Sequence, residues 1–271
     1  MVGSSQRRSL TAKAQVNGIT LDYAISGAGR LIAFGHSLGA SGKIFEPIRP
    51  ALENHGQVLT WDARGHGNSE KPVSGWTVED LAADLRALIE HLGENRAVVA
   101  GLSMGGNTAV VYAVAYPDTL DGLILVDTTA WYGEDAPEVW EQKALNAETE
   151  GMEPVLAANM SRWFSDSFPE EHPDRVKMVV ETVLANDPSC YAAAGRALGQ
   201  FDAREGLSQI DCPTLILVGS EDPATPPAMA EDLHQNIRNS ELHVLPGLRH
   251  MTPLEAPDLV GRLMTDFLEK L

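Results

Sequence analysis

Short apolar runs alternate along the sequence with longer stretches of helical periodicity, and this alternation limits the possible folds more than any other feature. The apolar runs are rich in β-branched and aliphatic residues and have the length of strands. They cover residues 21–25, 31–34, 57–61, 97–100, 122–126, 214–218 and 241–245. The later runs are continuously apolar, as expected of strands buried on both faces. The pattern predicts an α/β protein with a mostly parallel, doubly wound sheet and helices on both faces.

Helical patterns lie between these runs. Residues 78–92 carry leucine and isoleucine at spacings of three and four, which is typical of an amphipathic helix. Thr77 and Asp80 resemble a capping box at its start. A second helix is expected over residues 104–116, because Pro117 follows directly, and a last helix from about residue 257.

Residues 128–210 break the alternation, because they are helical in pattern and lie between two expected core strands. We therefore expect one α/β core made of residues 1–127 and 211–271, with residues 128–210 inserted as a helical lid. Three of the five tryptophans fall in the insertion, at Trp131, Trp140 and Trp163. These side chains either line a pocket or pack the lid onto the core, and the sequence leaves both roles open.

The net charge of the chain is strongly negative. There are 38 acidic residues against 20 lysines and arginines, which gives −18. Such a surface repels phosphate backbones and anionic lipids, so we expect neither nucleic acid nor a membrane as a partner. No apolar run approaches the roughly 18 residues of a membrane span. Assembly into a homo-oligomer stays open.

Two further features predict a cytoplasmic protein. Arg7 and Arg8 are not followed by the apolar run of a secretory signal peptide. Cys190 and Cys212 have no metal-ligand spacing, and so few cysteines do not make a disulfide framework.

The segment GLSMGG at residues 101–106 directly follows an expected strand and precedes an expected helix. This is the G-x-S-x-G sequence in the strand–turn–helix context of a nucleophile elbow. The glycines are needed because the positions two before and two after the serine approach closely, where a Cβ would clash. Ser103 is therefore the candidate nucleophile, at the carboxyl edge of the sheet, where clefts form in α/β folds.

A serine nucleophile needs a base, and the base needs an acid that fixes its orientation. In folds with this elbow the chain order is serine, acid, histidine. Asp222 lies in the turn-rich loop after residues 214–218 and is the candidate acid, while the adjacent Glu221 stays an alternative. His250 lies between the last expected strand and the last helix and is the candidate base.

An oxyanion hole needs backbone N–H groups from the residue after the nucleophile and from the loop after residues 31–34. Met104 and Ser37 are the candidate donors. His36, in the same loop as Ser37, either contacts the substrate or stabilises the loop. His66 lies in a glycine-rich turn and is expected to shape that turn.

With these residues in place, the chain resembles the α/β-hydrolase superfamily from about residue 17 to residue 271. Within it, the chain is most similar to bacterial 3-oxoadipate enol-lactonases and related lactonases and esterases. The resemblance rests on SLG at residues 37–39, DPATPP at 222–227, RWF at 162–164, NDP at 186–188, Tyr191 and DAR at 202–204. The spacing of Asp222 in its loop also matches that group and favours it over Glu221.

The resemblance implies a serine hydrolase that cleaves a carboxylic ester or lactone through an acyl-enzyme, with Ser103, Asp222 and His250 as its triad. A small-molecule ester or lactone is then the partner. No cofactor is implied, because the sequence has no metal-ligand cluster, phosphate-binding loop or nicotinamide fingerprint. The candidate substrate-binding residues are His36, Leu38, Trp131, Trp163 and Arg162.

Arg162 and Arg204 are also candidates for pairing with a substrate carboxylate, such as that of 3-oxoadipate enol-lactone. Each is equally consistent with a surface ion pair. Residues 128–210 contain 15 acidic and six basic residues, a balance that disfavours the approach of an anion.

Other functions of the same fold stay open. A serine nucleophile argues against epoxide hydrolases and haloalkane dehalogenases, which use aspartate at this position. It is compatible with hydrolases of C–C bonds and with cofactor-free perhydrolases. A ligand receptor that has lost catalysis is a more remote alternative, because the full set of triad residues is present.

Overall fold

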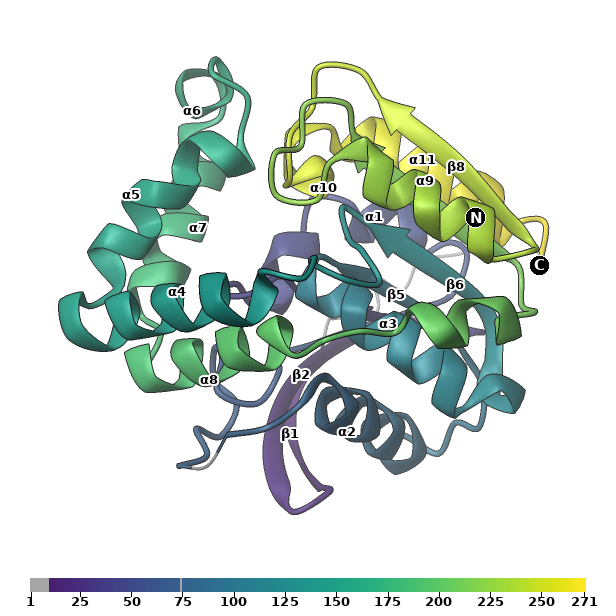
Figure 1. The fold of residues 1–271 in the computed structure, drawn as a ribbon. Helices are drawn as coiled ribbons and strands as arrows, with labels where there is room; N and C mark the ends of the chain where they lie inside the picture. Colours follow the sequence, from purple (N-terminus) through teal and green to yellow (C-terminus); the bar gives the residue numbers. More distant parts are fainter. Residues whose placement is uncertain (1–9, 74) are drawn as a thin grey trace, which may run out of the picture.

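The computed structural model describes residues 10–73 and 75–271, so Arg7 and Arg8 lie outside the described residues. These residues form an eight-stranded sheet with the order β1-β2-β4-β3-β5-β6-β7-β8 (Figure 1). The strands are β1 (Leu10–Val16), β2 (Ile19–Gly27), β3 (Leu31–Gly35), β4 (Gln57–Trp61), β5 (Ala97–Leu102), β6 (Leu120–Val126), β7 (Thr214–Gly219) and β8 (Ser240–Leu245). β2 pairs antiparallel with β1 and with β4, and all other neighbours pair parallel. The predicted α/β class with a mostly parallel sheet is confirmed.

Strand β1 is one element that the sequence analysis missed. It forms a hairpin with β2 in which Val16 pairs with Ile19, so the loop is Asn17-Gly18. Both loop residues have positive φ, 47° and 74°, as a type I′ turn requires. The Asn-Gly pair was a usable signal for this hairpin, although the polar alternation of β1 hid the strand itself.

Helices cover both faces of the sheet (Figure 1). The core helices are α1 (Arg49–Leu52), α2 (Val78–His91), α3 (Met104–Ala115), α9 (Pro227–Asn236), α10 (Thr252–Glu255) and α11 (Pro257–Leu268). α2 packs beside α3, and α1 packs beside α11. The predicted capping box begins α2: the Thr77 N–H donates to Asp80 Oδ2 at 2.8 Å, and the Asp80 N–H donates to Thr77 Oγ1 at 3.3 Å.

Further helices lie between β6 and β7, where the sequence predicts an insertion. They are α4 (Ala136–Glu150), α5 (Met152–Trp163), α6 (Phe168–Glu171), α7 (Pro173–Leu184) and α8 (Pro188–Gly199). Figure 1 shows them as a separate layer to one side of the sheet, with α4 packed along α8. Their position puts the insertion over the end of the sheet where β5 leads into α3.

The two connections between this insertion and the core meet in a short antiparallel bridge. Trp131 pairs with Asp202, and the Ala203 N–H donates to the Ala130 carbonyl at 2.9 Å. The Arg204 guanidinium lies 3.6 Å from the centroid of the Trp131 ring and 2.5 Å from the Asp202 carboxylate. We call these five residues, Ala130, Trp131, Asp202, Ala203 and Arg204, the neck of the insertion.

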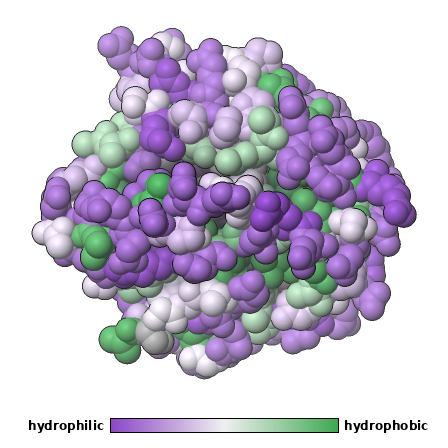
Figure 2. Space-filling model, viewed as in Figure 1, coloured by the Kyte–Doolittle hydropathy of each residue, from purple (hydrophilic) through white to green (hydrophobic). Residues whose placement is uncertain are grey.

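Hydrophilic residues dominate the face of the molecule in Figure 2, and hydrophobic residues show between them in smaller groups. Within the part of the chain that the structure describes, no helix combines the length and the apolar character needed to cross a membrane.

The first turn of α3 lies very close to the sheet. A Cβ on Gly105 would lie 2.0 Å from the carbonyl oxygen of Gly35 in β3, and a Cβ on Gly101 would lie 2.1 Å from the carbonyl carbon of Gly105. Only glycine allows backbone to approach backbone at these distances. This close approach fixes the position of the turn between β5 and α3.

We predict that Gly105→Ala lowers the free energy of unfolding by about 2–3 kcal/mol or more, because the new methyl group meets backbone atoms that cannot move aside. Gly261 in α11 is a matched control: a Cβ there would lie 3.5 Å from the Ala51 Cβ, an ordinary contact. Gly261→Ala should be neutral or should stabilise the protein by up to about 1 kcal/mol. Urea unfolding measures both, and equal stability of Gly105→Ala and the wild type would contradict the prediction.

Candidate active site

Ser103 lies at the turn between β5 and α3 in a backbone conformation that side chains rarely adopt, with φ 55° and ψ −115°. Its N–H donates to the Val126 carbonyl at 3.0 Å. Its carbonyl accepts from the Asn107 N–H at 2.9 Å and from Thr128 Oγ1 at 2.8 Å. These bonds to β6 and α3 hold the strained residue in place.

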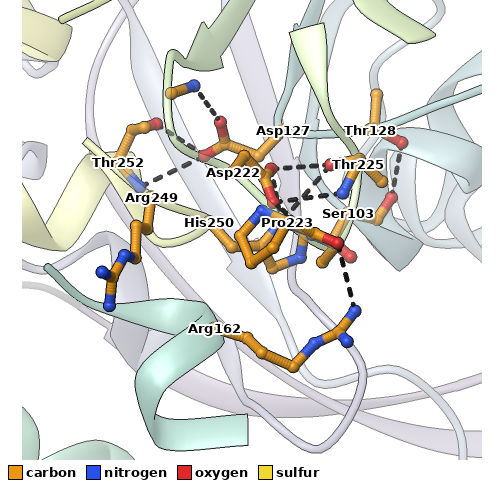
Figure 3. Close-up of polar contacts among 12 residues, drawn as sticks. Ser103, Asp127, Thr128, Arg162, Asp222, Pro223, Thr225, Arg249, His250 and Thr252 are labelled. Carbon is orange, nitrogen blue, oxygen red and sulfur yellow. Dashed lines mark hydrogen bonds and ion pairs between the residues drawn. The ribbon is translucent and has the colours of Figure 1, made fainter. Parts of the chain in front are cut away.

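Gly106, the residue directly after the motif, is also required to be glycine. A Cβ on Gly106 would lie 2.5 Å from the Thr128 Cβ. Glycine at this position therefore lets Thr128 approach closely enough to bond the Ser103 carbonyl, as Figure 3 shows.

His250 and Asp222 form a buried hydrogen-bonded pair. His250 Nδ1 lies 2.7 Å from Asp222 Oδ2, and the two residues are 3% and 2% exposed. The other bonds to the Asp222 carboxylate come from Thr225 Oγ1 at 2.8 Å and from the N–H groups of Thr225 and Ala224 at 3.1 and 2.7 Å. Glu221, the alternative acid, is exposed. The structure thus puts Asp222, and not Glu221, against the histidine (Figure 3).

The surroundings of Asp222 favour its charged form. Burial by itself would raise its pKa, but the charge of His250 and the hydrogen bonds from His250 and Thr225 lower the pKa below its usual value. Asp222 is therefore a carboxylate that can fix the ring of His250 and stabilise an imidazolium.

Ser103 and His250 both line a cavity of about 340 Å³ between the sheet and the inserted helices. Ser37 and Leu38, from the loop after β3, line the same cavity. Met104 is the first residue of α3, so its N–H belongs to the unpaired first turn of the helix. The structure thus brings the candidate nucleophile and base together with Ser37, one of the two candidate oxyanion donors.

His36 lies beneath this loop and is 1% exposed. Its Nε2 accepts from the Ala63 N–H at 2.9 Å, so its Nδ1 carries the proton and donates to the Ser37 carbonyl at 2.8 Å. His36 does not occur among the described residues that line the cavity. Of its two expected roles, the geometry supports stabilisation of the loop and not contact with the substrate.

His66 packs against His36, with the ring centroids 5.1 Å apart. Burial lowers the pKa of His36 to about 4. Burial, together with the neighbouring His36, lowers the pKa of His66 to about 3. Both rings are therefore neutral at physiological pH and join the Ser37 loop to the turn after β4.

The candidate substrate contacts of the insertion divide into two groups. Trp163 and Arg162 line the cavity. Trp131 belongs to the neck, where its ring is covered by Arg204, and neither of them occurs among the described cavity-lining residues. Trp131 is thus a structural residue of the neck. The chain enters the insertion at this residue, and its ring packs against Arg204, where the chain returns to the core.

Two cations face the cavity from the insertion. Lys143 Nζ lies 4.1 Å from the centroid of the Trp140 ring, and burial first, then the charge of Arg162, lowers the pKa of Lys143. Arg162 Nη2 donates to the Pro223 carbonyl at 3.4 Å, a contact drawn in Figure 3. A bound anion would stabilise the charged form of Lys143 and reduce its repulsion with Arg162, so this part of the cavity favours an anionic group.

Sequence reasoning missed several residues of this site. Lys143 and Tyr132 both line the cavity. The Tyr132 hydroxyl donates to Asn107 Oδ1 at 2.9 Å, and burial raises its pKa. Nothing in the local pattern distinguishes these residues from surface positions on a helix or loop. Asp127, a buried acid directly after β6, was also missed, although an aspartate at the end of an apolar strand was a usable signal.

Over the described residues, no group of three or more histidine, cysteine, aspartate or glutamate side chains is arranged to hold a metal ion.

Comparison with known families identifies the fold. Residues 30–257 match the family model of the alpha/beta hydrolase fold, which is most of the chain. The chain belongs to the α/β-hydrolase family. This family assignment confirms the resemblance inferred from the elbow and from the order of the serine, the acid and the histidine.

Relatives within the α/β-hydrolase family include lactonases and esterases. The chain is 31% identical to 3-oxoadipate enol-lactonase 2 of Acinetobacter baylyi over 241 residues, covering 88% of this chain and 89% of that protein. The crystal structure of the enol-lactonase from Burkholderia xenovorans LB400 matches with a TM-score of 0.91 and 34% identity, over 95% of this chain and all of the other. A malate-bound thermophilic esterase from Thermogutta terrifontis matches with a TM-score of 0.91 and 30% identity, over 96% and 98%.

We predict that the buried histidine pair makes stability depend on pH. Their folded-state pKa values lie below the ordinary 6.5, so the unfolded chain binds more protons and the free energy of unfolding falls as pH drops from about 6.5 toward 4. In His66→Gln the loss between pH 7 and pH 5 should be smaller than in the wild type. His234→Gln, which changes an exposed histidine of α9, should leave the loss unchanged. Urea unfolding at both pH values measures this, and equal losses in wild type and His66→Gln would contradict it.

Proposed function

We propose that this α/β hydrolase cleaves a carboxylic ester or lactone through an acyl-enzyme, with Ser103 as nucleophile, His250 as base and Asp222 as the orienting acid. The observation that carries the proposal is the buried 2.7 Å contact between His250 Nδ1 and Asp222 Oδ2 behind a cavity that Ser103 and His250 both line. The similarity to enol-lactonases over most of the chain supports the same chemistry.

In the first step, Ser103 Oγ attacks the carbonyl carbon while His250 Nε2 takes the hydroxyl proton. The N–H groups of Ser37 and Met104 stabilise the oxyanion, and the partial positive charge at the start of α3 adds to this stabilisation. The C–O bond of the ester then breaks, and His250 returns the proton to the leaving oxygen. In a lactone this oxygen stays attached to the acyl group.

In the second step, His250 takes a proton from water, and the resulting hydroxide attacks the acyl-enzyme. Ser103 leaves with the proton from His250, and the carboxylic acid is released. The inserted helices act as a cap that holds a folded substrate over Ser103. The apolar side chains of this cap that line the cavity include Trp140, Trp163 and Val155.

The cavity favours a substrate that carries a carboxylate. Lys143 and Arg162 bring two positive charges to the cap side, and Asp135 is the acidic residue from the cap that shares the cavity. A local pair of partly desolvated cations outweighs the screened negative surface at short range. The 3-oxoadipate in the name of the enol-lactonase relative and the malate bound in the Thermogutta structure are both carboxylates, which supports this proposal.

We predict that Ser103→Ala abolishes hydrolysis of p-nitrophenyl acetate and labelling by a fluorophosphonate probe. Asp222→Asn should lower kcat by about 10⁴-fold, because the amide cannot hold the histidine in the required tautomer. Glu221→Gln, the matched control at the adjacent exposed acid, should stay within about threefold of the wild type. Circular dichroism checks that each variant is folded. Turnover or labelling by folded Ser103→Ala would refute the proposed nucleophile.

We further predict that Lys143→Met and Arg162→Met raise KM for a carboxylate-bearing enol-lactone by about tenfold or more, because each removes a charge-assisted contact worth about 1.5–3 kcal/mol. KM for a neutral lactone of the same ring size should change less than threefold. Lys177→Met, at an exposed lysine of α7, is the control and should affect neither substrate. Equal effects on the charged and the neutral lactone would show that these cations do not recognise a carboxylate.

A further inference from the structure

A second buried carboxyl group, Asp127, lies in the site beside Asp222 and has no part in the proposed reaction steps (Figure 3). Asp127 directly follows β6, is 0% exposed and has a positive φ of 44°. Its N–H donates to the Leu217 carbonyl of β7 at 2.8 Å. A non-glycine residue in a strained conformation persists where its surroundings hold it, so the side-chain contacts of Asp127 explain its position.

Those contacts join two separate segments of the chain. Oδ1 accepts from the Gly219 N–H at 3.0 Å. Oδ2 accepts from the Thr252 N–H at 3.2 Å and lies 2.7 Å from Thr252 Oγ1. Gly219 ends β7 and leads into the loop of Asp222, while Thr252 follows His250 by two residues and begins α10.

The two segments also touch each other at this point. A Cβ on Gly219 would lie 2.3 Å from the Arg249 carbonyl oxygen, so the backbone next to His250 runs directly over the end of β7. One carboxyl group therefore spans the place where the loop of the acid and the loop of the base meet. The relative position of these loops sets the 2.7 Å contact between Asp222 and His250.

The surroundings of Asp127 oppose a charge on it. The polar groups that bond its oxygens, in the described structure, belong to Gly219 and Thr252, and neither is a cation. Burial first, and then the nearby charge of Asp222, raise its pKa well above the usual value, and they outweigh the hydrogen bonds from Thr252 and Gly219, which lower it. Thr252 Oγ1 donates to a charged Asp127. A neutral Asp127 has one proton to donate, and only this hydroxyl can accept it, by reversing that bond, because both N–H groups are donors.

We propose that Asp127 is a positioning residue that acts uncharged, as a hydrogen-bonding clamp between the loop of Asp222 and the segment after His250. It holds Asp222 and His250 at hydrogen-bonding distance from each other and leaves Asp222 as the charged partner of the histidine. This inference rests on the proposed roles of Asp222 and His250.

The test compares three variants of the full chain with a carboxylate-bearing enol-lactone and with p-nitrophenyl acetate as substrates. Asp127→Ala removes the clamp. Asp127→Asn keeps an uncharged group of the same shape, whose amide can donate to Thr252 Oγ1 and accept from the Gly219 N–H, and which loses only the 3.2 Å bond from the Thr252 N–H. Asp84→Ala is the matched control, because Asp84 is also 0% exposed but bonds Arg64 at 2.6 Å and Asn17 at 2.8 Å, away from the cavity.

We expect Asp127→Ala to lower kcat by about ten- to a hundredfold with KM within threefold of the wild type, since small displacements of reacting groups cost about this much. Asp127→Asn should recover kcat to within about fivefold of the wild type. In a plot of kcat/KM against pH, the fall of activity on the acid side should occur at the same pH as in the wild type. Asp84→Ala should lower the melting temperature and leave kcat of the folded enzyme within threefold.

Three results would overturn the inference: normal kcat in folded Asp127→Ala, an Asn variant no better than the Ala variant, or an acid limb in Asp127→Asn displaced downward by a pH unit or more. The last would mean that Asp127 is charged in the wild type. Failure of the proposed function is recognised separately, because Ser103→Ala or Asp222→Asn would then stay active whatever the Asp127 variants do.

Discussion

The contact between the first turn of α3 and the sheet is the constraint on which the candidate active site depends. Gly101 and Gly105 let the helix backbone meet β3 and β5 without side chains between them. The chain can reverse from strand to helix in this space only if Ser103 takes a positive φ. The same turn exposes the serine hydroxyl to the cavity and leaves the N–H groups at the start of α3 unpaired, so geometry and electrostatics have one origin.

Around this turn, the pKa of each ionisable group is set by its local environment. The Asp222 carboxylate receives four hydrogen bonds, one of them from His250, and these stabilise its charge. Asp127, only a short distance away, meets neutral groups and the charge of Asp222. His36 and His66 are kept neutral by burial. The pKa values of the two aspartates are thus shifted in opposite directions, and Asp222 is the carboxylate that lies against His250, the proposed base.

The sequence sufficed for the class of the sheet and for the elbow, because both depend on local patterns: apolar runs, helical periodicity and glycines around a serine. The place of His250 and Asp222 followed from chain order, and the contact between them agrees with that order. The contents of the cavity could not be predicted in the same way. Whether Trp131 or Lys143 faces the substrate depends on how the inserted helices pack on the core.

The position of His36 was also not predictable from the local sequence. It adjoins Ser37 in sequence, yet its ring points beneath the loop and is held by Ala63, a residue far along the chain. Proximity in sequence therefore did not predict proximity to the substrate. Strand β1 was missed for another reason: it lies at the edge of the sheet, where polar and apolar residues alternate, and so it lacks the continuous apolar run that marks the buried strands.

The neck of the insertion has a consequence for how such an enzyme changes over evolutionary time. The chain leaves and re-enters the core at paired residues, Trp131 and Asp202, so the helices between them are covalently joined to the core at one place. Hydrogen bonds also tie these helices to the two neighbours of His250: the Met251 N–H donates to the Trp163 carbonyl, and Arg249 Nη1 donates to the Ser161 and Phe164 carbonyls. A sequence change that moves the end of α5 to admit a new substrate therefore also acts on the histidine loop, whereas changes in the other inserted helices can reshape the cavity with less effect on it.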